Sequence, residues 1–227
     1  MNYTYTILLL LLTYSRLAFG SDSEEIKTFK GCINDKHLIR MTLNIKENGD
    51  VVGFYYYESE KIHIPLHGKL VNNKIELAEN LEFSGTFIQG FKGTLSNNEI
   101  KGVWADSIKK QKFKFSVLLE ERSNPNKKFK RMEGDYQATD ADPNHIQKLK
   151  LSYVSGSIFK FEVSTQTKSG CSGILTGMVS FANDKGNFKD EGCAALKFQI
   201  NDDSILLSEY DCSYHGIQCS FMGTYKK

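Results

Sequence analysis

The sequence predicts an all-β protein made of two small antiparallel meander β-barrels, or barrel-like sandwiches, in tandem, the second of them stapled by disulfides. Apolar and polar residues alternate with a period of two over most of the chain, as in strands with one buried face. Turn signals rich in Asn, Asp and Gly recur about every 8 to 15 residues, which is typical of a meander. Four of the five cysteines lie in the last third of the chain.

The first 20 residues have the pattern of a secretory signal peptide. A leucine-rich run from Ile7 to Leu12 precedes Ala18-Phe19-Gly20, which fits the small-x-small motif read by signal peptidase. The run is too short to span a bilayer as a helix, which needs about 20 residues. We therefore expect a secreted or periplasmic mature chain that begins near Ser21 and has no stable membrane insertion.

The predicted N-terminal barrel covers residues 27–122. Apolar residues in residues 37–45 are spaced mainly by two, and Asn48-Gly49 follows, which supplies the positive φ angles of a tight hairpin turn. Residues 51–57 then return as the next strand. The segment 75–83 could form two helical turns, but its strand-like flanks favour strand, loop, strand.

A polar, proline-containing segment at 123–128 predicts a linker, and the second barrel is expected over 129–227. Both halves repeat a glycine followed two positions later by an aromatic, a pattern in which the glycine bends the strand and the aromatic covers the gap. The second half begins with MEGDY and ends with FMGTY, so we expect these two strands to pair and close the barrel. The repeated signature occurs at Gly53-Phe54-Tyr55, Gly85-Thr86-Phe87, Gly102-Val103-Trp104, Gly134-Asp135-Tyr136 and Gly223-Thr224-Tyr225.

The strands GFYYYESEKIHIPLHGKL, SGTFIQGFKGTL and IKGVW resemble a β-barrel module of secreted and periplasmic bacterial proteins of unassigned function. The segments GCSGILTG, GCAALKFQI and CSYHGIQCSFMGTYKK are similar to cysteine-paired domains of bacterial envelope proteins, some appended to lysozyme-inhibitor-like proteins. The resemblance covers nearly the whole mature chain and rests mostly on structural residues. It implies a compartment and a fold more than an activity, and it offers no partner for Cys32.

Four cysteines in one exported domain predict two disulfides, for which three connectivities exist. The direction of the expected strands places all four at the same end of the barrel, and this favours Cys171 with Cys193 and Cys212 with Cys219. The fifth cysteine, Cys32, is expected to be a buried free thiol or an intermolecular bridge.

His215 lies between Cys212 and Cys219, so a zinc site or a catalytic thiol is an alternative to the disulfides. The spacing of six residues between the cysteines is wider than the tight pairs typical of zinc sites. We therefore predict neither a metal nor a cofactor. Tyr214 and His215 are expected at the tip of a stapled loop, available for recognition.

A second candidate recognition surface lies in the first barrel. The residues after Gly53 alternate, so Tyr55 and Tyr57 share one face of their strand and could be exposed. His63 and His67 lie on the face of the next strand opposite Ile64 and Leu66, and cross-strand packing or a solvated strand is the alternative for these four residues.

The charges and motifs narrow the function. After cleavage the chain is almost neutral, with interspersed signs, which gives no electrostatic footprint for nucleic acid. Nucleophile, metalloprotease, phosphate-loop and dinucleotide motifs are missing from the sequence. We expect a non-catalytic protein-binding or inhibitor-like module of the bacterial envelope, whose partner is an envelope or host protein. The alternative is a lipocalin-like carrier of a small apolar ligand, which would need an open barrel lumen.

Overall fold

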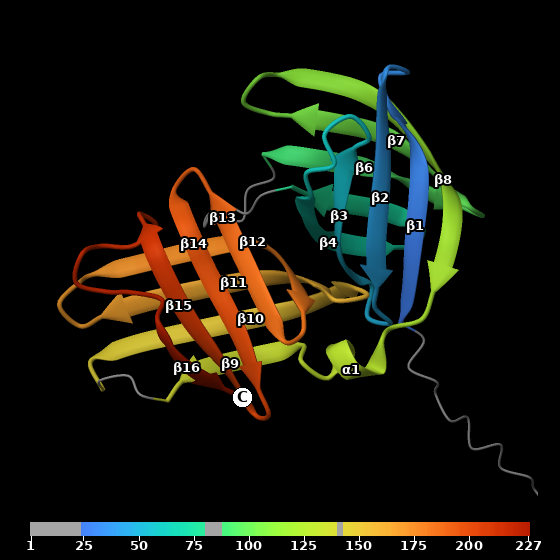
Figure 1. The fold of residues 1–227 in the computed structure, drawn as a ribbon. Coiled ribbons are helices and arrows are strands. Elements are labelled where there is room, and N and C mark those ends of the chain that lie inside the picture. Colours follow the sequence, from blue (N-terminus) through green and yellow to red (C-terminus); the bar gives the residue numbers. More distant parts are fainter. Residues whose placement is uncertain (1–23, 80–87, 140–142) are drawn as a thin grey trace, which may run out of the picture.

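The computed structural model describes residues 24–79, 88–139 and 143–227. The expected signal peptide, Gly85-Thr86-Phe87 and the second half of the segment 75–83 lie outside these residues. The described chain forms two closed barrels of eight antiparallel strands each, side by side, with one short helix between them (Figure 1). The predicted all-β tandem of barrels is confirmed. Within the described ranges, no helix is long and apolar enough to cross a membrane.

The first barrel is a meander of strands β1 to β8, and the second contains β9 to β16. The first comprises β1 (Glu25–Ile33), β2 (His37–Ile45), β3 (Asp50–Tyr57), β4 (Ile64–Val71), β5 (Lys74–Ala78), β6 (Gln89–Ser96), β7 (Glu99–Asp106) and β8 (Gln111–Ser123). The helix α1 (Lys127–Lys130) follows. The second comprises β9 (Gly134–Ala138), β10 (His145–Ser155), β11 (Ile158–Thr167), β12 (Ser172–Ala182), β13 (Lys185–Asp190), β14 (Cys193–Asn201), β15 (Ser204–Cys212) and β16 (Gly223–Lys226).

The first barrel closes where β1 pairs with β8 along nearly its whole length, from Ile26 opposite Ser123 to Ile33 opposite Phe115. The predicted hairpin at Asn48-Gly49 joins β2 and β3 and is confirmed, with Gly49 at φ 78°. The interior of the first barrel is filled by aliphatic and aromatic side chains from all eight strands. Fully buried members include Phe29, Ile39, Met41, Leu43, Leu66, Phe91 and Val117.

The second barrel closes through shorter seams. Strand β16 pairs with β9 at only two positions, Tyr225 opposite Ala138 and Lys226 opposite Gln137. This pairing of the first and last strands confirms the expectation from MEGDY and FMGTY. Strands β12 and β13 also share only two pairs, next to the hairpin that joins them, so they diverge towards the start of β12.

The glycine and aromatic signature shapes both barrels as expected. The aromatics two positions after Gly53, Gly102, Gly134 and Gly223 are all buried. At Gly102, a Cβ atom would lie 2.5 Å from the Cα of Gly93 on the neighbouring strand, so the two backbones approach too closely for any side chain. The glycines therefore allow the tight curvature of a small barrel, and the aromatics fill the space inside it.

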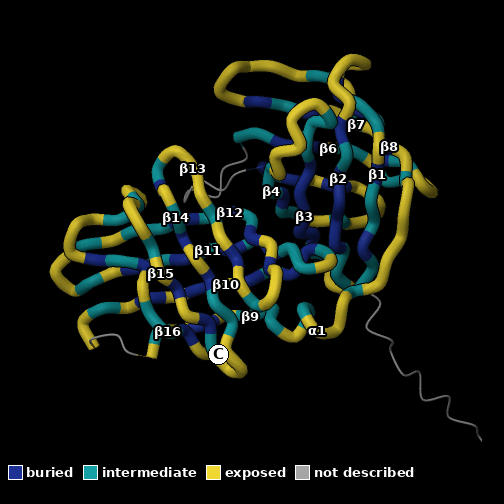
Figure 2. The backbone as a smooth tube through the Cα atoms, in the orientation of Figure 1, coloured by how far each residue is buried: buried dark blue, intermediate teal, exposed yellow. Residues whose placement is uncertain are grey.

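The two barrels pack against each other through the outer face of β3. Val52 and Phe54 contact Val154 at the end of β10 in a buried apolar cluster. The amide Nδ2 of Asn44, which is fully buried, donates to the backbone oxygen of Tyr153 at 3.0 Å. Ile26 of the first barrel packs into the core of the second. Figure 2 shows that exposed residues gather at the hairpin connections, whereas the strands themselves carry the buried positions.

The segment 123–128, expected to be a solvated linker, and the residues directly after it contact both barrels. Asn126 caps the short helix, and its backbone N–H donates to the hydroxyl of Tyr153 at 2.9 Å. Glu133 forms ion pairs with Lys46 of the first barrel and with Lys130 of the helix. These ion pairs outweigh the cost of burial and lower the pKa of Glu133.

Candidate functional site

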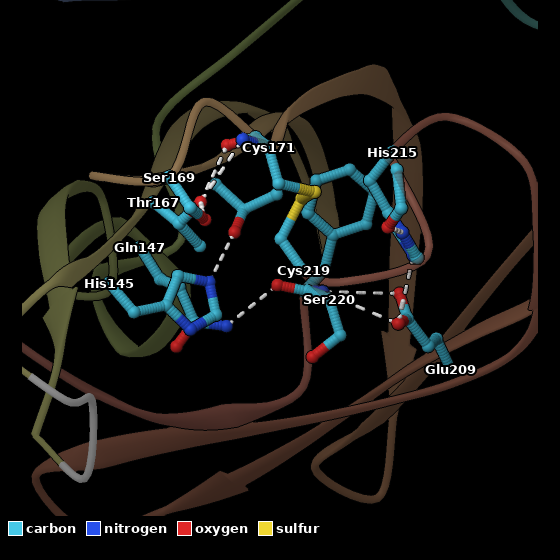
Figure 3. The surroundings of a disulfide bond; sticks show 12 residues. His145, Gln147, Thr167, Ser169, Cys171, Glu209, His215, Cys219 and Ser220 are labelled. Carbon is cyan, nitrogen blue, oxygen red and sulfur yellow. Dashed lines mark hydrogen bonds and ion pairs between the residues drawn. A yellow bond between two sulfur atoms is a disulfide. The ribbon is translucent and has the colours of Figure 1, made fainter.

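The C-terminal loop, residues 213–222, crosses one end of the second barrel (Figure 3). Its backbone pairs with the start of β12, where the N–H of Ile174 donates to the oxygen of Tyr214 at 3.2 Å and Gly173 bridges His215. This is the part of β12 that β13 leaves unpaired. The crossing loop therefore closes the opening between β12 and β13.

All four cysteines of this barrel form disulfides, as predicted, but the favoured connectivity is wrong. The bonds are Cys171 with Cys219 and Cys193 with Cys212. Cys193 and Cys212 are direct register partners on the neighbouring strands β14 and β15. The chain direction places the cysteines at one end, but it does not show that the crossing loop carries Cys219 over to β12.

Side chains under the crossing loop hold it in place. Phe221 is fully buried in the barrel core, and Gln147 donates to the backbone oxygens of Ser220 and Met222 at 2.7 and 2.9 Å. The carboxylate of Glu209 accepts from the backbone N–H of Phe221 (Figure 3). The loop is thus part of the fold, and not a free arm.

His215 is not the exposed loop tip that the sequence suggested. Its side chain is 13 % exposed, its Nε2 lies 3.0 Å from Oε1 of Glu209, and its ring packs edge-on against Phe221. Tyr214 is exposed, but its hydroxyl donates to Asp190 at 2.7 Å. Within the described residues, no three His, Cys, Asp or Glu side chains are grouped to hold a metal ion.

The expected recognition face of β3 is inside the first barrel. Tyr55 is 1 % exposed and donates its hydroxyl to Oε1 of Glu79 at 2.8 Å. Trp104 donates its indole N–H to the same oxygen. Tyr57 is partly buried beside Tyr55. Both faces of β3 are covered, one by the barrel core and the other by the second barrel. Tyr55 therefore lies in the core, and the expectation that it is exposed for recognition is wrong.

The Glu79 carboxyl group is a buried ionisable group that the sequence gave no reason to single out. Burial and the neighbouring Asp106 raise its pKa, although the hydrogen bonds from Trp104 and Tyr55 act in the opposite direction. Burial and the Glu79 charge in turn raise the pKa of Tyr55. Glu79, directly after β5, thus links β3 and β7 inside the barrel.

His63 and His67 lie on the outside of the first barrel, towards the second. The ring of His63 stacks on Phe54 with 4.1 Å between centroids. His67 is the register partner of Val52 and lines a groove between the barrels. Burial, and then the neighbouring Lys160, lower the pKa of His67 to about 4, so the ring is neutral at pH 7.

The groove between the barrels has a volume of about 450 Å³. One wall is the outer face of β3 and β4, and the other is the outer face of β10 and β11. The walls carry four lysines and two acids, which leaves an excess of positive charge. These are Lys46, Lys69, Lys150, Lys160, Asp50 and Glu162.

No local sequence pattern indicates this groove. Lys150 and Lys160 alternate with apolar residues on their strands and are ordinary outward-facing lysines in the sequence. Only the packing of one barrel on the other brings them opposite His67. Residues on separate domains, such as His67 and Lys160, carry no signal of proximity in a single sequence.

The comparisons with known proteins offer no relative from which to transfer a function. No family model, no curated protein and no solved structure matches this chain.

Proposed function

We propose that the protein is a non-catalytic binding protein of the bacterial envelope, secreted or periplasmic, that recognises a partner protein through its outer surface. One observation carries the proposal: both barrels are filled by their own side chains, while two lysines of the groove between them, Lys150 and Lys160, form no hydrogen bond or ion pair with the residues that the structure describes. A partner can therefore bind only to the outer surfaces of the barrels or in the groove between them.

The barrel interiors argue against the carrier. A carrier needs an open lumen, and a pocket for a small apolar ligand has a volume of about 300 to 1,000 Å³. The core of the second barrel is occupied by fully buried rings of Tyr153, Phe159, Phe161, Phe198 and Tyr225. In the first, Tyr55 and Phe91 contact each other edge to face at 5.0 Å across the interior.

The buried carboxyl groups favour a structural role over catalysis. Glu79 accepts hydrogen bonds from two interior side chains and is 4 % exposed. Asp106 accepts from the backbone N–H of Lys109. A glycosidase needs two carboxyl groups facing a substrate across a cleft, whereas these groups face the barrel's own residues.

The disulfides support an oxidising compartment. Both bonds join segments that the fold already brings together, and bonds of this kind persist outside the cytosol. Together with the leader-like residues 1–20, they favour export. The resemblance to cysteine-paired envelope domains adds the bacterial envelope to the proposal.

A pull-down from a bacterial envelope extract, with a lysozyme-inhibition assay beside it, tests the function. We expect a stoichiometric protein partner that competes with added untagged protein, or inhibition of lysozyme at a fixed molar ratio. Recovery of a bound lipid or other apolar molecule by native mass spectrometry, with no protein partner, would favour the carrier instead.

A further inference from the structure

The groove between the barrels is built from paired residues on both walls. On β3 and β4, Val52 lies opposite His67 and Asp50 opposite Lys69. On β10 and β11, Ser152 lies opposite Lys160 and Lys150 opposite Glu162. All of these residues line the groove. The two sheets therefore fix the backbone positions from which the charged side chains extend into the groove.

Lys160 is the least compensated charge in the groove. Its side chain is partly buried, and it makes no hydrogen bond or ion pair with any residue the structure describes. Burial, opposed by the Glu162 charge and aided by that of Lys150, lowers its pKa. A partly buried ammonium group without a partner is costly, and an anion placed beside it would remove that cost.

Lys150 adds a second ammonium group next to Lys160; it lies opposite Glu162 in the strand pair and forms no ion pair with any described residue. The two lysines lie diagonally across the pair β10 and β11, a spacing of about 7 to 8 Å between neighbouring positions in a sheet. By contrast, Lys46 and Lys69 are already paired with Glu133 and Asp50. The excess positive charge of the groove is thus concentrated at Lys150 and Lys160.

His67 supplies a neutral donor on the opposite wall. Its Nδ1 is buried and has no hydrogen-bond partner among the described residues. A proton on Nδ1 would be a buried donor without an acceptor, so the tautomer protonated on Nε2 is favoured. Because Nδ1 is the buried ring nitrogen, Nε2 is the one that can face the groove.

We propose that this groove binds a carboxylate-bearing segment of a partner protein, with Lys150 and Lys160 pairing with the carboxylates and Nε2–H of His67 donating to one of them. This inference rests on the proposed binding function and names the chemistry that the groove recognises. Ammonium groups held on rigid strands bind carboxylates by charge-assisted hydrogen bonds.

The rest of the lining favours an acidic peptide over a polyanion. Asp50 and Glu162 flank the lysines and would repel a continuous row of phosphates or sulfates. Val52 and Phe161 also line the groove, but they are only 6 % and 1 % exposed, so neither offers a ligand much apolar surface. A peptide can space its carboxylates to avoid Asp50 and Glu162, whereas a polyphosphate chain carries charge at every unit.

An NMR titration of the folded, oxidised protein tests this inference. The probes are the peptide acetyl-Asp-Ser-Glu-Ser-Asp-amide, inorganic phosphate and a neutral version of the peptide with Asn and Gln in place of the acids, at constant ionic strength. We expect saturable shifts of the His67 ring signals and of the backbone amides of Ser152 and Lys160 with the acidic peptide. The neutral peptide should cause no such shifts.

Three variants connect the binding to the two lysines. Lys150→Gln and Lys160→Gln should each weaken the acidic peptide, and the double variant should weaken it about tenfold. Lys197→Gln is the matched control, because Lys197 is an exposed lysine on β14 outside the groove. Lys150 is exposed, so its replacement keeps the test informative if Lys160→Gln does not fold.

The inference would be overturned by the absence of a saturable shift with the acidic peptide, or by equal weakening in Lys197→Gln and Lys150→Gln. Saturable phosphate binding that exceeds peptide binding would replace the peptide by a phosphate-bearing ligand and so contradict it. Failure of the envelope pull-down with an intact peptide titration would instead count against the proposed partner protein, while the groove's chemistry stands.

Discussion

The two barrels have the same number of strands and the same meander order, yet they are closed in different ways. In the first, β1 and β8 pair along nearly their whole length. In the second, the seam between β16 and β9 and the seam between β12 and β13 have two register pairs each. The disulfides occur only in the second barrel. Cys171–Cys219 fastens the crossing loop where the β12–β13 ladder is short, whereas Cys193–Cys212 joins β14 and β15, which pair along their whole length.

The interiors differ as well. The first barrel buries a polar group, the Glu79 carboxyl, and satisfies it with donors from Tyr55 and Trp104. The second barrel instead buries an apolar residue of its crossing loop, Phe221, in its core. One barrel is thus held by pairing and an internal hydrogen-bond network, and the other by a loop fastened across its open side.

The largest expected effect is the loss of the bond that fastens the crossing loop. The double variant Cys171→Ala, Cys219→Ala should lower the free energy of unfolding of the second barrel by about 4 kcal/mol, because the bond closes a long stretch of chain. Urea unfolding monitored by circular dichroism measures this loss. The fluorescence of Trp104, the single tryptophan, reports the first barrel and should shift less.

The other disulfide is the matched control. Cys193→Ala, Cys212→Ala opens a shorter loop between strands that are already paired, and we expect a loss of about 3 kcal/mol. If this pair proved the more costly to remove, the crossing loop would not be what closes the second barrel.

The next effect concerns the internal network of the first barrel. Glu79→Ala leaves the Tyr55 hydroxyl and the Trp104 indole N–H buried without an acceptor, which should cost about 2 to 3 kcal/mol. The urea midpoint from Trp104 fluorescence measures this change. Glu76→Ala removes an exposed carboxylate from β5 and should change stability by less than about 0.5 kcal/mol. Similar losses in the two variants would mean that the network does not stabilise the barrel.

The smallest predicted effect is a pH dependence at the groove. His67 has a pKa of about 4 in the folded protein against 6.5 ordinarily, so the unfolded chain binds more protons between these values. Stability should therefore fall as the pH drops from about 6.5 to 4. Since the ring is partly exposed, we expect a loss of about 1 to 2 kcal/mol.

Thermal unfolding across this pH range checks the assignment. His67→Gln should reduce the fall, and the lowered pKa of His63 contributes part of what remains. His37→Gln, a change at an exposed position of β2, should leave the fall unchanged. The lowered pKa of Glu133 adds a separate loss of stability below about pH 4.5, where its carboxylate takes up a proton and its ion pairs with Lys46 and Lys130 are lost. An unchanged profile in His67→Gln would contradict the burial of a neutral His67.

The strands, the hairpin at Asn48-Gly49 and the closing pair could be predicted because each leaves a local pattern of alternation or of turn residues. The disulfide pairing could not, since it depends on a loop that crosses from β15 to β12. Alternation separates Phe54 from Tyr55 correctly, but it does not say which face is inside. Here both faces of β3 are buried, which a single strand pattern cannot indicate.

The groove could not be predicted from the sequence either. Lys160 lies in the pattern FKFEV, where a lysine between two phenylalanines predicts a solvated outer face. It becomes unusual only because the second barrel presents it to His67 of the first. A property that arises from the contact of two domains leaves no local pattern in either of them.

Site-specific photocrosslinking tests most directly the central claim, that the protein binds its partner at the groove between two filled barrels. A photoreactive phenylalanine derivative would replace Lys69 at the exposed rim of the groove, and Lys197 as the control. In envelope extract, we predict a protein adduct at position 69 that excess acidic peptide suppresses, and none at position 197. Equal adducts at both positions, or none at position 69 despite a partner in the pull-down, would contradict the claim.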